Sequence, residues 1–272
     1  MPNASSSQGR TDYRRPRRTL SAWGRCKIAA ATLLAAAVFL ATSLLLVVIG
    51  LLTLFRTRRL YAEVITRRAS QICLALYGVR VAEINRPLFD NKQTVFISNH
   101  TSLLDMFVIM ALGLPNSRYF LSGFLRKYPP LWIVGWMIGV FWTVPQQYPQ
   151  RRTEIFQAAT QKLLSTGESV FLTPEGQQTW VFNRGAFHLA IELQAPIRPF
   201  YISIPNDTDP GPWIGGEGFS IRPGVIRVFF RDEIDTSQWT LDQVSQRRDE
   251  TRDMYLAWQE EITGEKPDLP SH

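Results

Sequence analysis

Residues 94–112 read TVFISNHTSLLDMFVIMAL and carry the pattern that decides the fold. The first five residues, 94–98, form a short run rich in β-branched and aromatic side chains, which is typical of a buried strand. Residues 103–112 form a longer apolar run that predicts a helix, and Ser102 before it is a suitable helix cap. The stretch therefore predicts a strand, a tight polar turn that contains His100, and a helix.

The same alternation of strands and helices extends in both directions from this unit. Further strands are predicted at 79–84, 118–122, 169–172, 197–203 and 226–230, and helices at 69–77, 152–165, 186–193 and 241–262. Strands that alternate with helices favour a parallel sheet, because each helix carries the chain back to the edge where it started. The sequence therefore predicts a single α/β domain at 60–262, with a largely parallel sheet flanked by helices.

The N-terminal part has a different character. Residues 1–27 form a basic tail rich in Ser, Arg and Pro that we expect to be disordered, and residues 28–55 contain no charged side chain. At about 1.5 Å per residue, a helix over 28–55 exceeds the roughly 30 Å bilayer core. Such a helix could span a membrane with tilt, or break near Gly50 into a shallow hairpin. We therefore expect a membrane anchor at 28–55, a helix or a helical hairpin, and a short tail at 263–272.

The positive charge of the chain is concentrated around this apolar segment. Residues 1–68 hold 12 of the 30 Lys and Arg residues but 2 of the 23 acidic residues, a net charge of +10. The remaining residues hold 18 basic and 21 acidic side chains, a net charge of −3. A nucleic-acid partner is therefore disfavoured, and anionic membrane lipids are favoured. The two cysteines, Cys26 and Cys73, are too few for a disulfide framework or a metal site.

A second uncharged stretch, residues 128–150, is rich in tryptophan and aliphatic side chains. It fits a buried helix followed by a strand. It fits equally well a surface that dips into the lipid interface, where tryptophan is favoured. Both interpretations remain open at the level of sequence.

His100 and Asp105 are the candidate catalytic pair. His100 lies in the predicted turn and Asp105 one turn into the following helix, so the carboxylate can reach back to the ring. A carboxylate on one ring nitrogen leaves the other nitrogen basic, which suits removal of a proton from an attacking hydroxyl. The pair alone is also compatible with an ordinary loop histidine and with an acid favoured by the helix dipole.

Further motifs follow the other predicted strands. Residues 171–176, FLTPEG, place Glu175 and Gly176 in a tight turn at a strand end. Ligand sites in parallel sheets gather at the carboxyl ends of strands, so we expect this turn near the candidate catalytic pair. Residues 183–187, NRGAF, form another turn, and residues 195–200, APIRPF, lead into a strand.

Together and in this order, these motifs resemble those of the glycerophospholipid acyltransferases, the family of 1-acylglycerol-3-phosphate acyltransferases. The resemblance lies in NHTSLLD at 99–105, PEG at 174–176 and the two prolines of 196–199, and it covers about residues 60–230. It implies a glycerolipid acyltransferase fold, acyl-CoA or acyl-carrier-protein as donor, a lysolipid acceptor, and no metal or other cofactor. The residues expected to bind substrate are Asn99, Ser102, Glu175, Gly176, Arg184, Arg151 and Arg152.

The chain departs from the family pattern at two positions. Pro145 stands where the second motif commonly has an arginine, and Gln178 stands where the third motif has one. The resemblance assigns these arginines to the acceptor phosphate, and neither proline nor glutamine offers a charged bidentate donor. Arg151, Arg152 or Arg184 could replace them, or the acceptor could be a lipid other than lysophosphatidic acid.

The leading hypothesis is an O-acyltransferase of phospholipid biosynthesis or remodelling. His100 is the general base, Asp105 orients it, Glu175 and Gly176 shape the acceptor site, and the backbone near residues 196–199 faces the developing oxyanion. The acceptor is a lysophospholipid or, alternatively, an amino-lipid with a free hydroxyl. A catalytically silent membrane protein that binds lipids is the alternative from another class. The expected location is an inner or intracellular membrane, with the domain facing the cytoplasm.

Overall fold

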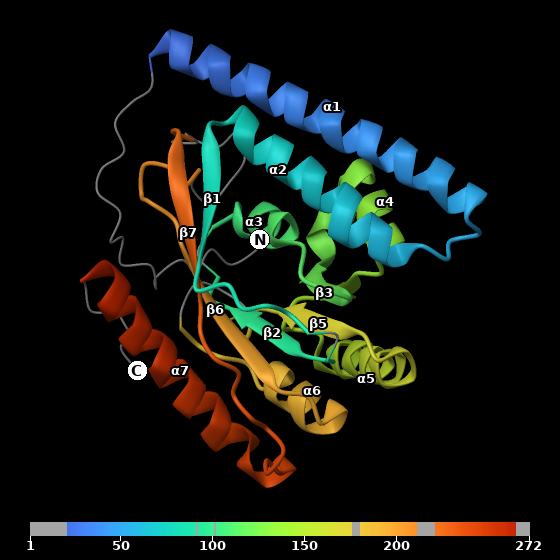
Figure 1. Ribbon diagram of the computed structural model, residues 1–272, viewed down its shortest axis with the longest axis vertical. Coiled ribbons are helices and arrows are strands. Elements are labelled where there is room, and N and C mark those ends of the chain that lie inside the picture. The colour runs from blue at the N-terminus through green and yellow to red at the C-terminus, as the bar shows by residue number, and fades with distance from the viewer. Residues whose placement is uncertain (1–20, 91, 101, 176–179, 211–220, 265–272) are drawn as a thin grey trace, which may run out of the picture.

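The computed structural model describes residues 21–90, 92–100, 102–175, 180–210 and 221–264, which form a seven-stranded sheet with helices on both faces (Figure 1). The strands are β1 (Val79–Ile84), β2 (Val95–Ser98), β3 (Ser117–Ser122), β4 (Phe141–Thr143), β5 (Ser169–Leu172), β6 (Ile197–Ser203) and β7 (Gly224–Phe230). The α-helices are α1 (Ala22–Leu52), α2 (Arg67–Leu76), α3 (Asp105–Leu112), α4 (Pro129–Ile138), α5 (Pro149–Thr166), α6 (Gly185–Leu193) and α7 (Val244–Thr263). The π-helix η1 (Leu60–Thr66) and the 3₁₀ helices η2 (Gly123–Lys127) and η3 (Leu241–Gln243) complete the set.

The strands lie in the order β1-β7-β6-β2-β5-β3-β4. The five strands from β6 to β4 in this order run parallel to one another, whereas β7 is antiparallel to β6 and β1 is parallel to β7. The prediction of a largely parallel α/β sheet is therefore confirmed. The ends of the five parallel strands meet at one side of the sheet, which we call the carboxyl edge.

The central strand β2 is buried on both faces. Phe96 belongs to a core that the sheet shares with α2, α3 and α4, while Val95 and Ile97 belong to a second core shared with α5, α6 and α7. The near-continuous apolar run of β2 is what such a doubly covered parallel strand requires. Figure 1 shows α1 as an additional layer, outside α2 and α4.

Helix α3 begins two residues later than the sequence predicts. Its N-cap residue is Leu104, not Ser102, and its first residue is Asp105. The Asp105 carboxylate accepts the Ser102 N–H at 3.0 Å, and the Ser102 hydroxyl accepts the Leu104 N–H at 3.2 Å. These two side-chain bonds hold residues 102–104 in a turn, so regular helix starts only after it.

Helix α1 is unbroken at Gly50. It continues to Leu52, and the chain then reverses through Leu54 and Phe55, both of which have a positive φ. Of the two alternatives, a break at Gly50 is therefore not seen. A Cβ at Gly50 would lie 2.7 Å from the Met137 side chain, so glycine at this position lets α1 pack closely on α4. Of the helices that the structure describes, α1 alone is long and apolar enough to cross a membrane.

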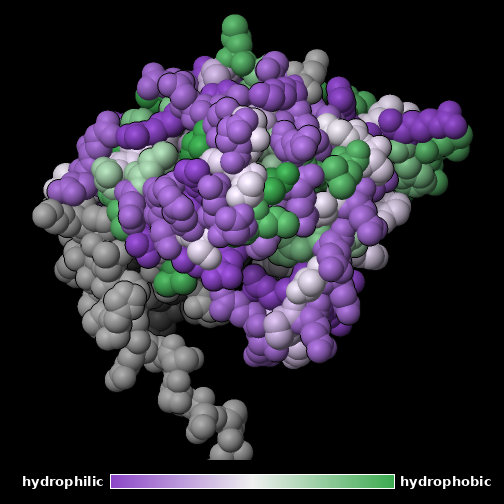
Figure 2. Space-filling view, turned by 90° about the horizontal axis from the view of Figure 1, so that it is seen from below, coloured by the Kyte–Doolittle hydropathy of each residue, from purple (hydrophilic) through white to green (hydrophobic). Residues whose placement is uncertain are grey.

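Polar contacts hold α1 against the domain. The Ser43 hydroxyl donates to the carbonyl of Pro130 at 3.0 Å, and the Tyr77 hydroxyl donates to Thr32 at 2.9 Å. The outer side of α1 exposes Leu33, Leu34, Leu40, Leu44, Leu45, Val48, Leu51 and Leu52. Figure 2, which views the molecule from the side away from α1, shows a mostly hydrophilic face. The exposed apolar side chains therefore concentrate on the α1 side of the molecule.

Residues 128–150 combine the two interpretations that the sequence allows. They form helix α4 and strand β4, with Val134, Met137 and Ile138 in the core. Trp132 and Trp136, on the same helix, are exposed. The stretch is thus a packed helix and strand that still presents two tryptophans to its surroundings.

A buried ion cluster fastens the chain that follows α1 to the amino edge of the sheet. Glu168, just before β5, pairs with Arg58 and with Arg118. Arg58 also donates to the carbonyls of Ser117 and Ile138, each at 3.1 Å. Burial by itself raises the pKa of Glu168, but the hydrogen bond from Arg118 and the charge of Arg58 outweigh it and hold this pKa below its usual value.

Helix α7 is joined to the two central strands by one buried hydroxyl. The Tyr255 hydroxyl lies 2.9 Å from the carbonyl of Ile97 on β2 and 3.0 Å from that of Phe200 on β6. Tyr255 is fully buried, and burial raises its pKa well above the usual value. The hydroxyl therefore stays neutral and fixes α7 across both strands.

We expect Tyr255→Phe to lower the free energy of unfolding by about 1–3 kcal/mol, because two buried carbonyls lose their shared donor. The measurement is the Tm in detergent, compared with that of Tyr148→Phe, which removes the hydroxyl of an exposed tyrosine. Equal Tm values for the two variants would show that the hydroxyl does not stabilise the contact between α7 and the sheet.

Candidate active site

Asn99 sets the position of the site at the carboxyl edge. It follows the last residue of β2 and is fully buried. Its side-chain amide donates to the Ile202 carbonyl at 3.0 Å, and its side-chain oxygen accepts the Ile202 N–H at 2.8 Å. These two bonds continue the pairing of β2 with β6 beyond the end of β2, so His100 starts from a fixed point.

His100 and Asp105 are in direct contact. The ring nitrogen Nδ1 lies 2.8 Å from the Asp105 Oδ2, and the His100 side chain is 37% exposed while that of Asp105 is 2% exposed. A carboxylate on Nδ1 assigns the proton to that nitrogen, which leaves Nε2 as the basic one. Asp105 opens α3, where the helix dipole favours a negative charge. The predicted pair therefore has the geometry of an oriented general base.

Glu175 supports the same turn from the neighbouring strand. It lies just after β5, is 2% exposed, and accepts the backbone N–H of His100 at 3.2 Å through Oε2. Its other oxygen accepts the N–H of Trp180 at 2.6 Å, and Trp180 has a positive φ of 58°. Glu175 therefore fixes the backbone at both His100 and Trp180. Gly176, which the sequence assigns to the same turn, lies outside the described residues.

Ser102 links the turn to a residue that the sequence analysis does not single out. Its N–H donates to Asp105, and its hydroxyl lies 2.9 Å from Oδ1 of Asp209. Asp209 lies 107 residues further along the chain, in the segment after β6. No local pattern marks it, because Asn, Asp and Pro residues are the ordinary composition of a turn.

A buried tyrosine, Tyr201, is a further ionisable group near His100 and Asp105. Burial, followed by the charges of Glu175 and Asp105, raises the pKa of Tyr201 on β6 above its usual value. The phenol is therefore neutral at physiological pH, and the negative charge near His100 comes from the carboxylates. In the part of the chain that the structure describes, no group of three or more His, Cys, Asp or Glu side chains is arranged to hold a metal ion.

The three candidate arginines lie at the carboxyl edge but on other elements. Arg151 and Arg152 are in the first turn of α5, which follows β4, and Arg184 immediately precedes α6. Among the described residues, no hydrogen bond or ion pair joins these arginines to the turn of His100. The structure thus brings His100, Asn99, Ser102, Asp105 and Glu175 together and does not join the arginines to them.

The segment with the proline pair lies beside β2, short of the turn of His100. The N–H of Val95 donates to the carbonyl of Pro196 at 2.9 Å, and Val95 pairs with Ile197. Pro199 pairs with Ile97, three residues before His100, which is roughly 10 Å along the strand. The structure does not bring this backbone to the turn of His100, because β6 runs parallel to β2 and reaches the level of Asn99 only at Ile202.

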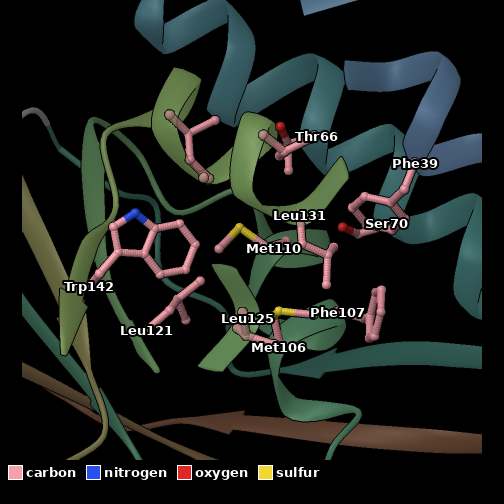
Figure 3. A pocket seen from close by; sticks show the side chains of 13 residues that line it. Phe39, Thr66, Ser70, Met106, Phe107, Met110, Leu121, Leu125, Leu131 and Trp142 are labelled. Atoms are coloured by element: carbon pink, nitrogen blue, oxygen red, sulfur yellow. The ribbon is translucent and has the colours of Figure 1, made fainter. Parts of the chain in front are cut away.

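A small apolar pocket, with a free volume of about 20 Å³, lies next to the start of α3 (Figure 3). Its wall includes Met106 and Phe107, the two residues after Asp105. The wall is completed by residues from α1, η1, α2, α3, β3, η2, α4 and β4: Phe39, Thr66, Ser70, Met110, Leu121, Leu125, Leu131, Val134, Gly135, Ile138 and Trp142. Figure 3 shows Trp142 and Phe107 on opposite sides of this space.

Comparisons with known proteins agree with these features. A family model described as "Acyltransferase" matches residues 79–203. The 1-acyl-sn-glycerol-3-phosphate acyltransferase of Limnanthes alba is 26% identical over 209 residues, which cover 74% of this chain and 69% of the plant protein. The 1-acyl-sn-glycerol-3-phosphate acyltransferase alpha of Mus musculus is 28% identical over 199 residues, which cover 69% of this chain and 66% of the mouse protein.

A solved structure has the same fold. The crystal structure of the 1-acyl-sn-glycerophosphate (LPA) acyltransferase PlsC from Thermotoga maritima superposes with a TM-score of 0.58, at 17% sequence identity, and covers 83% of this chain and 96% of that protein. At this identity the likeness concerns the fold alone. With the family model and the sequence relatives, it confirms the resemblance that the motifs indicate. Residues 79–203 are therefore an acyltransferase domain similar to those of the 1-acyl-sn-glycerol-3-phosphate acyltransferases, and the protein is an O-acyltransferase.

Proposed function

We propose that this protein transfers a fatty acyl group from a thioester donor, acyl-CoA or acyl-carrier-protein, to the hydroxyl of a lysophospholipid. The single observation that carries the proposal is the 2.8 Å contact between His100 Nδ1 and the buried Asp105. It leaves a partly exposed, basic imidazole at the carboxyl edge of a parallel sheet, which is where such folds bind their ligands.

The proposed reaction needs one base and no covalent enzyme intermediate. Nε2 of His100 takes the proton of the acceptor hydroxyl while its oxygen attacks the thioester carbonyl. The tetrahedral oxyanion then collapses, the C–S bond breaks, and the leaving thiolate takes the proton from the imidazolium. Asp105 stabilises the imidazolium while it exists, as a carboxylate does in other histidine-dependent acyl transfers.

The apolar pocket supports binding of the acyl chain. Its wall begins at Met106 and Phe107, one and two residues after Asp105, so a chain bound there would have its carbonyl end near the base. Burial of apolar chain in such a pocket contributes about 0.8 kcal/mol per CH₂ group. We therefore propose that the acyl chain of the donor enters here, by displacing the side chains that fill most of this space.

Two observations bear on the acceptor head group. The relatives named above are 1-acyl-sn-glycerol-3-phosphate acyltransferases, which supports 1-acylglycerol-3-phosphate as acceptor. Pro145 and Gln178, however, replace the two arginines that the family motifs provide. Arg151 and Arg152 lie at the N-terminus of the 18-residue helix α5, where backbone N–H groups also favour an anion. This helix end is the alternative site for an acceptor phosphate, in place of the two missing arginines.

We further propose that the α1 side of the molecule contacts the membrane. Its leucines and the exposed Trp132 and Trp136 of α4 lie on packed neighbouring helices. Tryptophan is favoured at the lipid interface, and basic residues lie at both ends of α1, including Lys27 and Arg56. A helix lying in the interface keeps both ends on one side of the membrane, which we take to be the cytoplasmic side.

The catalytic assignment is tested by His100→Ala and Asp105→Asn. We expect His100→Ala to lower kcat by about 10²–10⁴-fold, because the hydroxyl must then lose its proton without a base. Asparagine at 105 still bonds the ring but cannot offset the imidazolium charge, so a small residual activity is expected. The measurement is acyl transfer by purified protein at matched concentration.

His188→Ala is the matched control, since His188 lies on α6 and should keep the activity of the unchanged protein. The Tm of each variant verifies folding. Near-normal transfer by folded His100→Ala would contradict the proposal and leave the lipid-binding alternative or a different base.

The acceptor assignment is tested by competition between lysolipids. We expect lysophosphatidic acid to be used without a clear preference over lysophosphatidylcholine or a hydroxylated amino-lipid, because Pro145 and Gln178 cannot grip a phosphate. A strong preference for lysophosphatidic acid would contradict this expectation. If that preference disappeared in Arg151→Ala/Arg152→Ala, the phosphate contact would have moved to α5.

The membrane assignment is tested by extraction. We expect carbonate at high pH to leave the protein in the membrane pellet, because the apolar side of α1 needs no charge to bind. Leu44→Ser/Leu51→Ser should weaken binding to vesicles. Leu241→Ser, on η3, removes an equally exposed leucine from another part of the surface and should not. Complete release by carbonate would refute the anchor.

A further inference from the structure

The segment after β6 presents a buried carboxylate to the site. Asp209 is 5% exposed, and its N–H and that of Thr208 both donate to the carbonyl of Pro205, at 3.0 and 2.8 Å. Thr208 is buried against Gly224, where a Cβ would lie 2.1 Å from the threonine hydroxyl. The turn is therefore fixed both internally and against the start of β7, so Asp209 occupies a defined position.

The bond between Asp209 and Ser102 has a defined direction. The Ser102 hydroxyl accepts the N–H of Leu104 at 3.2 Å, so its own proton is available to the carboxylate of Asp209 at 2.9 Å. A hydrogen bond to a charged acceptor is among the stronger ones, and both side chains are buried. The pair thus ties the catalytic turn to the end of β6.

The same serine controls the second contact of the catalytic carboxylate. Oδ2 of Asp105 accepts both His100 Nδ1, at 2.8 Å, and the Ser102 N–H, at 3.0 Å. The direction of this oxygen toward the ring therefore depends on where the Ser102 backbone lies. That position in turn depends on the hydroxyl, which Asp209 holds.

We propose that Asp209 is a positioning residue for the general base: through the Ser102 hydroxyl it fixes Asp105 against His100. The inference rests on the proposed role of His100 as the base. Four ionisable side chains from different segments surround the turn, namely Asp105, Glu175, Tyr201 and Asp209. Loss of Asp209 removes one negative charge near His100 and leaves the Asp105 carboxylate less firmly held against the ring. Both changes disfavour the charged imidazolium form of His100.

The experiment compares Asp209→Ala, Asp209→Asn and Ser102→Ala with Asp207→Ala. Asp207 is the matched control, because it lies in the same turn but is exposed. We expect Asp209→Ala to lower kcat roughly tenfold to a hundredfold, as displacement of a catalytic group does, with KM unchanged. Asparagine at 209 can still accept the serine hydroxyl and should restore most of kcat. The double variant Ser102→Ala/Asp209→Ala should lose no more than the worse single variant.

A second readout does not depend on activity. The chain has three histidines, so ¹⁵N NMR of labelled histidine, assigned with His100→Gln and His188→Gln, follows the pKa of His100 directly. This pKa should fall in Asp209→Ala and Ser102→Ala, and should stay unchanged in Asp207→Ala. If Asp209 only stabilised the fold, its replacement would lower the folded fraction and leave the pKa of His100 in the folded protein unchanged.

Two results would overturn the inference. One is a folded Asp209→Ala protein with unchanged kcat and an unchanged His100 pKa relative to Asp207→Ala. The other is an effect of the double variant equal to the product of the two single effects. His100→Ala, measured in parallel, distinguishes failure of the proposed base from failure of the positioning role. If His100→Ala keeps its activity, the proposed base is wrong. If His100→Ala is inactive while Asp209→Ala has normal activity, only the positioning role of Asp209 is wrong.

Discussion

The end of a buried strand is the constraint on which the rest of this site depends. β2 lies between β5 and β6 with side chains buried on both faces, so its backbone has partners along its whole length. Where the chain must leave the sheet, these partners are lost, and unpaired buried backbone groups are costly. The Asn99 amide replaces them by bonding both polar groups of Ile202. The sheet therefore fixes the start of the turn that contains His100, and this turn is more rigid than an ordinary loop.

Three buried carboxylates then hold this turn from three segments of the chain. Asp105 comes from the start of α3, Glu175 from the end of β5 and Asp209 from the segment after β6. Isolation of such groups from water would be unfavourable without hydrogen-bond donors. Each carboxylate receives one or more donors from the turn itself. The cost of burying negative charge is thus met by the same bonds that leave the imidazole oriented and partly exposed.

The sequence predicts the layout of the sheet and the catalytic pair because both are local. The apolar runs mark the strands, and His100 and Asp105 lie within one strand–turn–helix unit. Predictions that depend on how distant segments meet are less complete. The proline pair of residues 196–199 is a recognisable motif, but only the parallel pairing of β6 with β2 places it alongside β2 and short of the turn of His100. Asp209 has no signal at all, since its partner lies 107 residues away. The helix start at Asp105 also escapes prediction, because Ser102 bonds within the turn.

Helix α1 also contributes to the apolar pocket. Phe39, near its middle, lines the pocket, and Ser43 one turn later donates to the start of α4, which forms another wall of the same pocket. Removal of α1 would take Phe39 out of the wall and the Ser43 hydrogen bond away from α4, so the pocket would lose one side. The long apolar helix and the pocket are therefore parts of one unit, and neither can be removed without changing the other.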